Sequence, residues 1–315
     1  MRTFDYSPAV RATLPLLLGI AGPTGSGKTY SALRVATGMQ KVSGGDVAVI
    51  ATEAKRATAY SSYFAFNHLD LAPPFGPLDY LDAIDFAVKK GAKHVVVDSM
   101  THEHSGPGGV MDQINRWLDE KCGDNYAERE KKNMLAHKKP KADRKELNNF
   151  IIQAGRGGVN FIFCYRADEK VKPVQGQGIQ KMGMTPETTS KLVYEMMAMF
   201  LLTASCDGRP NVTPETPLEK MLTKLPVQFR DMIAGGEPLS EALGQKLAEW
   251  AKGTPSAPPV SLADLEAKGW AEAKKGSVAL IAFWKTLTPD QAKKLTAIKD
   301  SDWKPLAAQA DQPAA

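Results

Sequence analysis

The chain has 315 residues, enough for one sizeable domain with an appendage or for two domains, and 43% of them are hydrophobic, as in a globular protein. No apolar run approaches the roughly 20 residues that span a bilayer, the N-terminus lacks a signal-peptide core, and three widely spaced cysteines argue against a disulfide framework, so we expect a cytoplasmic protein with no membrane contact. The net charge of +5 permits nucleic-acid binding without arguing for it.

The first motif of the chain is a glycine-rich loop at residues 22–29. Its sequence, Gly-Pro-Thr-Gly-Ser-Gly-Lys-Thr, matches the phosphate-loop pattern G-x-x-x-x-G-K-[ST] at every fixed position. An apolar run at 16–20 predicts a strand before the loop, and residues 30–39 predict a helix after it. In such a loop, backbone N–H groups converge on an anion, Lys28 adds positive charge and the Thr29 hydroxyl binds Mg²⁺. The predicted nucleotide-binding residues are Gly22, Pro23, Thr24, Gly25, Ser26, Gly27, Lys28, Thr29 and Tyr30.

Two later apolar runs are bounded by an acidic residue. Residues 47–51 predict a strand that leads to Glu53, and the β-branched run at 95–99 contains Asp98. A run of this kind downstream of a phosphate loop is typical of the second strand of a nucleotide site, so we expect the Asp98 carboxylate to reach the Mg²⁺ shell through water.

The remaining elements alternate between strand and helix. Residues 63–69 favour a further strand, and residues 77–90 favour a helix because their apolar side chains recur at helical spacing. Residues 110–155 are helical and very polar in pattern, while 159–164 and 197–203 add two strands. Strands that alternate with helices indicate an α/β fold with a mostly parallel sheet flanked by helices, whose ligands bind at the carboxyl ends of the strands.

The composition changes near residue 252. Residues 253–260 are rich in glycine, serine and proline, which is typical of a linker. We expect residues 1–252 to form the nucleotide-binding core, with a basic helical insertion at about 110–155, and residues 311–315 to form a disordered tail. Residues 261–310 predict a small helical domain with a core of Trp270, Leu280, Phe283, Trp284, Leu287, Leu295 and Trp303.

The residues that follow the phosphate loop resemble those of a RecA-type ATPase core. In RecA-like enzymes the strand after the phosphate-loop helix ends in a glutamate that activates the attacking water, and residues 49–53 have that form. A GTPase would carry a guanine-reading Asn-Lys-x-Asp strand, which this sequence lacks. Residues 98–110 and 163–170 are similar to segments of the AAA-type, RecA-fold ATPases of tailed phages, a group that includes the Sak-type single-strand annealing and recombination proteins. Together with residues 224–250, this resemblance covers roughly residues 14–252.

The resemblance implies a RecA-like P-loop NTPase that hydrolyses ATP with Mg²⁺. Its catalytic residues would be Lys28, Glu53 and Arg166, and its Mg²⁺ ligands would be Thr29 and Asp98. Lys28 would neutralise the β- and γ-phosphates, while Glu53 would orient or deprotonate the attacking water.

The basic residues after the fifth predicted strand allow two interpretations each. Arg166 stands where RecA-like proteins usually carry a polar sensor of the γ-phosphate, more often glutamine, but it could instead form a structural ion pair with Asp168 or Glu169. In RecA-like filaments a lysine pair of one subunit reaches the ATP of its neighbour. Lys170 and Lys172 are candidates for this contact, although they could equally be solvated lysines of a hairpin.

Basic side chains concentrate in the polar insertion between residues 129 and 145. Only Glu130 and Asp143 oppose them in that stretch, and the alternative to a DNA-binding surface is a solvated helix face. The glycine-containing loop at 170–181 occupies the place where RecA-like proteins carry a mobile DNA-binding loop, and phosphate contacts there would make binding sensitive to salt. The candidate DNA-binding residues are Lys131, Lys132, Lys138, Lys139, Lys141, Arg144, Lys145 and Lys181.

The histidines that follow Asp98 do not form a metal motif. His102 and His104, even with Cys122, lack the spacing of a zinc signature. We expect this segment to be a loop that couples the nucleotide state to DNA, because its glycines permit unusual backbone conformations.

The function predicted from these features is ATP hydrolysis coupled to action on single-stranded DNA, in recombination or strand annealing, by a ring or filament of identical subunits in the cytoplasm of a bacterial host. A helicase-like or packaging-type DNA motor shares the same core. An ATP-regulated adaptor would use the C-terminal helical unit to bind a partner protein. A small-molecule kinase has less support because no arginine-rich lid follows the phosphate loop.

Overall fold

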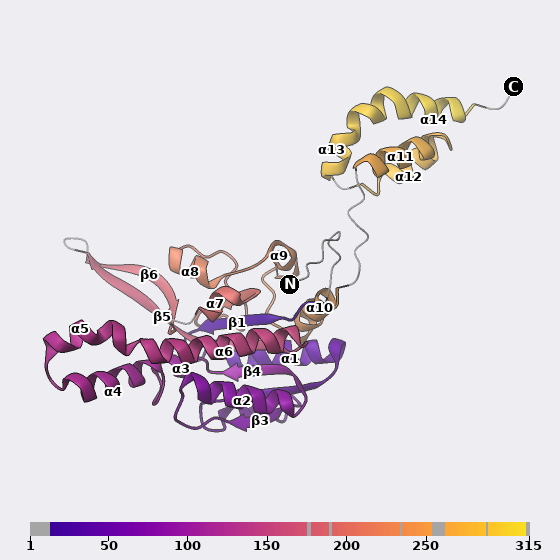
Figure 1. Ribbon diagram of the computed structural model, residues 1–315. Helices are drawn as coiled ribbons and strands as arrows, with labels where there is room; N and C mark the ends of the chain where they lie inside the picture. Colours follow the sequence, from indigo (N-terminus) through magenta and orange to yellow (C-terminus); the bar gives the residue numbers. More distant parts are fainter. Residues whose placement is uncertain are drawn as a thin grey trace, which may run out of the picture. The chain divides into compact units, whose positions relative to one another are not determined.

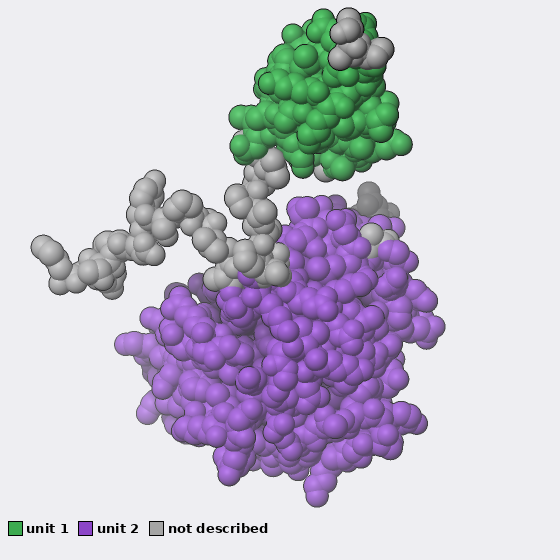
Figure 2. All heavy atoms as spheres, turned by 90° about the vertical axis from the view of Figure 1, so that its right-hand side faces the viewer, with its two compact units in different colours: residues 1–11, 255–315 green, residues 12–254 purple. Residues whose placement is uncertain are grey.

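The computed structural model describes residues 13–174, 178–188, 191–233, 235–253, 262–287 and 289–312. The described residues form two compact units (Figure 2), which we call the core unit (residues 13–253) and the C-terminal unit (residues 262–312). Within the described residues, no helix is both long enough and apolar enough to cross a membrane. The predicted linker beyond Gly253 and residues 313–315 of the predicted tail lie outside them.

The core unit is built on a sheet that has seven strands among the described residues. Six strands run parallel in the order β3-β2-β4-β5-β1-β7, and β6 pairs antiparallel with β5. The strands are β1 (Leu17–Gly22), β2 (Asp46–Ala51), β3 (Asn67–Asp70), β4 (Ala92–Asp98), β5 (Asn160–Val174), β6 (Gly178–Pro186) and β7 (Ala198–Leu201). The predicted fold class, an α/β core with a mostly parallel sheet, is confirmed. In this order β5 separates the phosphate-loop strand β1 from β4, the strand that ends at Asp98.

One face of the sheet is covered by α1 (Lys28–Ser43), α9 (Val227–Ile233) and α10 (Glu241–Ala251). The backbones of α1 and α10 approach closely, since a Cβ atom on Gly38 would lie only 2.0 Å from the carbonyl oxygen of Glu241. This contact holds in place the helix that begins at the phosphate loop.

The opposite face is covered by α2 (Pro77–Lys89) and α6 (Lys138–Arg156). Ile84 of α2 and Leu147 and Ile151 of α6 are fully buried against the strands. Leu147 and Ile151 are four positions apart and therefore share one side of the helix. The opposite side of α6 is left to polar residues.

The predicted polar insertion consists of α4 (Val110–Cys122), α5 (Tyr126–Ala136) and α6. The short helix α3 (His102–Ser105) precedes it, and α7 (Leu192–Glu195) and α8 (Pro217–Leu222) follow later in the chain. Figure 1 shows the α4–α5 pair and the β5–β6 hairpin extending past the same end of the sheet. Two parts of the molecule thus project beyond that end.

Two predictions about local structure were wrong. The strand predicted at 63–69 begins only at Asn67, because residues 56–60 form a 3₁₀ turn, η1, and the chain then turns again before β3. The predicted loop at 170–181 is largely a β-hairpin, since β5 continues to Val174 and pairs with β6. The glycines of β6 concealed that strand from the sequence pattern.

The C-terminal unit contains α11 (Leu262–Ala273), α12 (Ser277–Trp284), α13 (Pro289–Ile298), the π-helical turn η2 (Lys299–Trp303) and α14 (Lys304–Ala310). Its core includes Leu280, Phe283, Leu295 and Trp303 as predicted, with Trp284 and Leu287 partly buried against them. The prediction that Trp270 belongs to this core was wrong, because its side chain is exposed. Its neighbour Gly269 faces inward instead, and a Cβ atom there would lie 2.2 Å from the Trp303 ring.

Candidate functional site

The phosphate loop connects β1 to α1 at the carboxyl edge of the sheet. Gly25 and Gly27 adopt positive φ angles of 79° and 85°, which favour glycine. Gly22 is confined for another reason, since a Cβ atom there would lie 2.5 Å from the carbonyl oxygen of Leu202. The loop ends at the N-terminus of α1, where unpaired N–H groups and the helix dipole attract anions.

Lys28 is held inside the loop. Its Nζ donates hydrogen bonds to the carbonyl oxygens of Gly22, at 2.9 Å, and Pro23, at 2.8 Å. Burial lowers the pKa of the Lys28 ammonium below its ordinary value, against the opposing effect of nearby Cys164 and Asp98. The two backbone carbonyl groups therefore hold the Lys28 amine at the phosphate loop.

Thr29 and Asp98 lie in direct contact although they are far apart in the sequence. The Thr29 hydroxyl donates a hydrogen bond of 2.5 Å to the Asp98 carboxylate at the end of β4. Burial raises the pKa of Asp98, against the opposing effect of this hydrogen bond. A hydroxyl beside one partly buried carboxylate is an oxygen donor set that suits Mg²⁺, which takes its other ligands from water and phosphates. The two predicted ligands therefore fit the ion.

Glu53 is paired with two arginines. Its carboxylate accepts hydrogen bonds from Arg166 of β5 and from Arg56 of η1. Burial alone would raise the pKa of Glu53, but the hydrogen bond and charge of Arg166, together with Arg56, lower it below its ordinary value. Glu53 is thus held as a carboxylate of reduced basicity. The alternative pairing of Arg166 with Asp168 or Glu169 is not among the ion pairs of the described residues, in which the partner of Arg166 is Glu53.

A hydrogen-bond network joins the strand ends that carry these residues. The Thr52 hydroxyl accepts a bond of 2.8 Å from the backbone N–H of Ser99 and lies 2.7 Å from Nδ1 of His102. The Thr101 hydroxyl accepts a bond of 2.8 Å from the backbone N–H of Arg166. These contacts fix Glu53, Asp98 and Arg166 relative to one another. The sequence analysis missed Arg56, Thr52 and Thr101, and their only sequence signal is their position beside the acidic residues.

The predicted catalytic and metal-binding residues line one cavity of about 430 Å³. This volume lies within the range of small-molecule sites. The lining residues are Thr24, Gly25, Gly27, Lys28, Thr29, Ala51, Glu53, Arg56, Ala57, Ala59, Tyr60, Asp98, Ser99 and Arg166. The structure therefore brings together Lys28, Thr29, Glu53, Asp98 and Arg166, as the sequence analysis expected.

Tyr30 lines a second cavity of about 340 Å³. Gly25 and Gly27 line both cavities, so the two adjoin at the phosphate loop. The Tyr30 ring packs against the rings of Tyr60 and Phe64, with centroids 5.8 and 5.3 Å away. The predicted nucleotide-binding residues thus extend from one cavity to the other.

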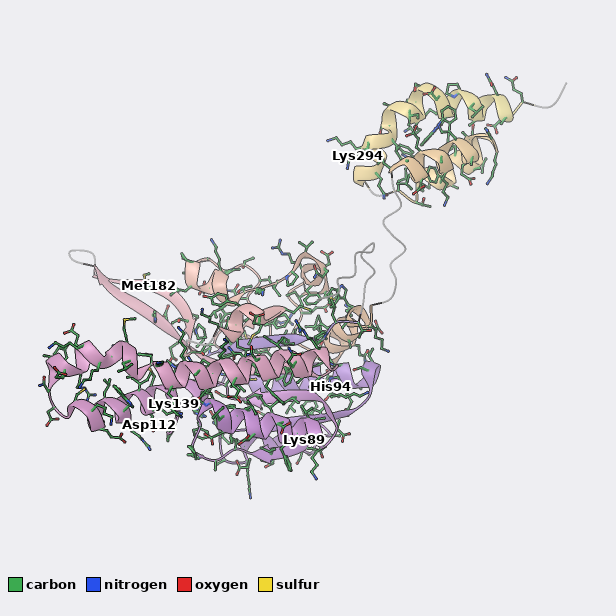
Figure 3. All side chains as sticks on the ribbon, viewed as in Figure 1. Lys89, His94, Asp112, Lys139, Met182 and Lys294 are labelled. Carbon is green, nitrogen blue, oxygen red and sulfur yellow. The ribbon has the colours of Figure 1, made fainter. Side chains whose placement is uncertain are left out.

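The candidate DNA-binding lysines fall into two groups. Lys131 and Lys132 both pair with Glu128, at 3.5 and 3.3 Å, and Lys139, labelled in Figure 3, pairs with Asp143 at 3.0 Å. The second group is exposed on α6 and consists of Lys138, Lys141 and Lys145. These three residues are spaced i, i+3 and i+7, so they share one side of the helix. We call them the α6 lysine stripe.

Lys170 is exposed on β5, four residues beyond Arg166. The side chains of Lys172 and Lys181 lie outside the described residues.

Arg144, also a DNA-binding candidate, is held in an ion pair inside the core unit. Its guanidinium forms a bidentate ion pair with Glu103 of α3, with Nε–Oε1 and Nη2–Oε2 distances of 2.7 Å each. The Arg144 side chain is only 13% exposed and that of Glu103 is fully buried. This pair ties α6, which carries the lysine stripe, to the segment that directly follows the Asp98 strand.

Replacing Arg144 with alanine is expected to destabilise the core unit by about 3–5 kcal/mol, because it leaves the Glu103 carboxylate buried without its partner. The effect should be visible in urea unfolding of the full chain. Lys145→Ala removes an exposed neighbour on the same helix and should change the free energy of unfolding by less than about 0.5 kcal/mol. Equal effects of the two changes would contradict a structural role for the ion pair.

The histidine segment after Asp98 shows no metal site. Among the described residues, no group of three or more His, Cys, Asp or Glu side chains lies close enough to hold a metal ion. Glu103 is bound to Arg144 and His102 to Thr52, as described above. Burial lowers the pKa of both His102 and His104, which favours their neutral forms.

No protein-family model matches the chain, and no curated protein matches it. Among solved structures, the chain is similar to a KaiC-like protein from the hyperthermophilic archaeon Pyrococcus horikoshii OT3, with 15% identity and a TM-score of 0.29. The likeness covers 58% of this chain and 88% of that one. At this identity the chemistry of the site has to be inferred from its own residues.

Proposed function

We propose that the chain binds ATP with Mg²⁺ and hydrolyses it to ADP and phosphate. The observation that carries this proposal is the meeting of Lys28, Thr29, Glu53, Asp98 and Arg166 in one cavity at the carboxyl edge of the sheet. A phosphate loop alone would support nucleotide binding. A partly buried acid beside the loop threonine and a second acid that lines the same cavity add the parts that hydrolysis requires.

Each residue has a distinct part in the proposed reaction. Lys28 and the N-terminus of α1 would stabilise the negative charge of the β- and γ-phosphates. Thr29 and Asp98 would hold Mg²⁺, which supplies positive charge to the phosphate oxygens when bound. Glu53 would orient the attacking water and accept its proton.

The ion pair with Arg166 would make the basicity of Glu53 depend on whether ATP is bound. In the structure the Arg166 guanidinium lies in the cavity and pairs with Glu53. A γ-phosphate in that cavity would compete for the guanidinium, because arginine binds phosphate by the same bidentate geometry as carboxylate. Release from Arg166 would raise the basicity of Glu53 at the moment when a water molecule needs a base.

We further propose that the ATPase acts on single-stranded DNA, in recombination or strand annealing. Two described features support this. The α6 lysine stripe offers three exposed cations on one side of a helix, and the Arg144–Glu103 ion pair links that helix to α3, which follows the strand of Asp98. The β5–β6 hairpin shares strand β5 with Arg166. The α6 lysine stripe and the β5–β6 hairpin are therefore both connected to segments that carry residues of the proposed site, which would let DNA change the turnover of ATP.

Assembly into a ring or filament of identical subunits belongs to the same proposal, with Lys170 and Lys172 reaching the site of a neighbour. We also propose that the protein works in the cytoplasm of a bacterial host. Translocation along DNA would assign the same core to a helicase-like or packaging-type motor.

The α6 lysine stripe provides a direct test of DNA binding. Changing Lys138, Lys141 and Lys145 together to glutamine should weaken binding of oligothymidylate by about tenfold or more at low salt, and should lower the slope of log affinity against log salt by about 2. Fluorescence anisotropy at several salt concentrations measures both quantities. Loss of affinity with no change in slope would argue against phosphate contacts.

A matched control removes the same charge elsewhere in the core unit. Lys41, Lys246 and Lys252 are exposed on α1, on α10 and just beyond α10. Their triple change to glutamine alters the net charge equally, so it should leave most of the affinity intact. If both triple variants lost the same affinity for oligothymidylate, the loss would be explained by net charge and the α6 lysine stripe would not be the DNA-binding surface.

A further inference from the structure

The helix α12 of the C-terminal unit is apolar on all of its sides. Its sequence between Ser277 and Trp284 is Val-Ala-Leu-Ile-Ala-Phe. Leu280 and Phe283 face the core of the unit and are almost fully buried, whereas Val278 is 84% exposed and Ile281 is 56% exposed. A helix that is apolar all round is usually covered all round. The unit covers only one side of α12.

A groove of about 390 Å³ lies beside the exposed side of α12. One wall is formed by α12, with Leu280, Ile281 and Trp284, and the other by the segment from η2 to α14, with Ala307. Figure 1 shows α12 and α14 as separate helices of the C-terminal unit, and both contribute residues to the groove. Its walls are mainly apolar.

The rim of the groove is positively charged. Lys285, Lys299 and Lys304 all line it, and none of the lining residues is acidic. The Asp300 carboxylate lies 2.9 Å from Nζ of Lys304 and 3.5 Å from that of Lys299. The Asp311 carboxylate also lies beside the groove, where it accepts hydrogen bonds of 3.1 Å from the backbone N–H of Ser277. Three ammonium groups against these two carboxylates still leave an excess of positive charge around an apolar groove.

We propose that this groove binds an acidic peptide segment of a partner protein through one or two apolar anchor side chains. The anchors would contact Ile281 and Trp284, and the flanking carboxylates would face the three lysines. Complementary charge of this kind fixes orientation and raises the rate of association, while burial of the anchors supplies affinity. The proposal is independent of ATP hydrolysis, since no residue of the groove belongs to the core unit.

Two observations favour an acidic peptide over other occupants. A single-stranded nucleic acid binds by stacking bases on open aromatic faces, but Nζ of Lys299 already lies 4.0 Å from the centre of the Trp284 ring. A second copy of the same groove would place lysines against lysines across a two-fold axis, which is unfavourable. An acidic segment satisfies both the apolar walls and the charged rim.

The test measures fluorescence anisotropy of short labelled peptides with the full chain. The panel contains aspartate- and glutamate-rich peptides with one phenylalanine and one leucine, placed one, two or three positions apart. Two reference peptides replace either the acidic residues by lysine or the apolar residues by serine, and labelled oligothymidylate is a further probe. We expect saturable binding of at least one acidic apolar peptide, and at least about tenfold weaker binding of both reference peptides.

Variants locate the site. Ile281→Ser and Lys285→Glu should each weaken binding by about tenfold, because one removes an apolar contact and the other reverses a rim charge. Val278→Ser and Lys274→Glu make the same kinds of change at exposed positions outside the groove and should have little effect. All four side chains lie outside the buried core cluster of the unit, and thermal unfolding of each variant checks that the unit still folds.

Several results would overturn the proposal. It fails if no acidic apolar peptide binds, if the serine peptide binds equally well, or if groove and control variants behave alike. Tight binding of oligothymidylate that Lys285→Glu abolishes would make the groove a nucleic-acid site. Self-association that Ile281→Ser abolishes, measured by sedimentation, would make it an interface between copies of the chain. None of these results affects ATP turnover, so the proposed ATPase function is tested separately.

Discussion

Replacing Glu53 with glutamine is expected to leave ATP binding nearly unchanged and to lower the rate of hydrolysis by at least about 100-fold. Glutamine keeps the size of the side chain and can still accept a hydrogen bond from Arg166, but it cannot take a proton from water. Equilibrium binding of a fluorescent ATP analogue and release of phosphate from ATP measure the two steps separately. Normal binding together with slow phosphate release would identify Glu53 as a group that acts in the chemical step.

The control for this change is Glu169→Gln. Glu169 lies on β5, three residues after Arg166, and its side chain is exposed. The same chemical change there should leave turnover close to normal, because Arg166 pairs with Glu53 and not with Glu169 among the described ion pairs. Near-normal hydrolysis by Glu53→Gln would remove Glu53 from the role of base.

Replacing Asp98 with asparagine is expected to lower hydrolysis by about 1,000-fold and to weaken the dependence of ATP binding on Mg²⁺. Asparagine preserves the shape of the side chain and can still accept the hydrogen bond from Thr29, but it carries no charge for the ion. Burial raises the pKa of the Asp98 carboxyl, which disfavours its ionised form. A bound cation would act in the opposite direction and favour the carboxylate.

The measurement is a titration of nucleotide binding and turnover with Mg²⁺. Wild-type protein should need less Mg²⁺ for half-maximal turnover than Asp98→Asn, whose activity should stay low at any concentration. Lys28→Ala is the companion variant, since it should abolish hydrolysis by removing charge from the phosphates. An unchanged Mg²⁺ requirement in Asp98→Asn would contradict its role as an ion ligand.

Much of the site could be predicted because its parts are local in the sequence. The phosphate loop is a continuous segment with fixed glycines. Glu53 and Asp98 each follow a short apolar run, and parallel strands bring such residues to one edge of the sheet. Arg166 joins them because β5 lies between β1 and β4.

Two contacts between charged residues could not be predicted. Arg56 follows Glu53 by three positions, and it reaches the Glu53 carboxylate because residues 56–60 form a 3₁₀ turn. The sequence of that segment shows neither a strand pattern nor a helix pattern. Arg144 looked like one more member of a basic run. Its pairing with Glu103 depends on how α6 packs beside α3, and sequence spacing carries no information on that packing.

In two further places the hydrophobic pattern led to a wrong prediction because of glycine residues. Gly178 and Gly183 weaken the signal of β6, whose pairing with β5 supplies the stabilisation that its own residues lack. In the C-terminal unit, tryptophan at 270 was assigned to the core by its apolar character. The small residue beside it, Gly269, is the one that faces the Trp303 ring. The proposed domain boundaries, the linker and the roles of the site residues stay predictions.

The most direct test of the central claim is the rate of phosphate release from ATP with Mg²⁺, measured with and without single-stranded DNA, with the oligomeric state determined by sedimentation in each sample. We expect hydrolysis that single-stranded DNA accelerates, in an assembly of several subunits, and almost none in Glu53→Gln under either condition. Hydrolysis that is indifferent to DNA in a monomeric protein, or turnover that persists in Glu53→Gln, would contradict the account.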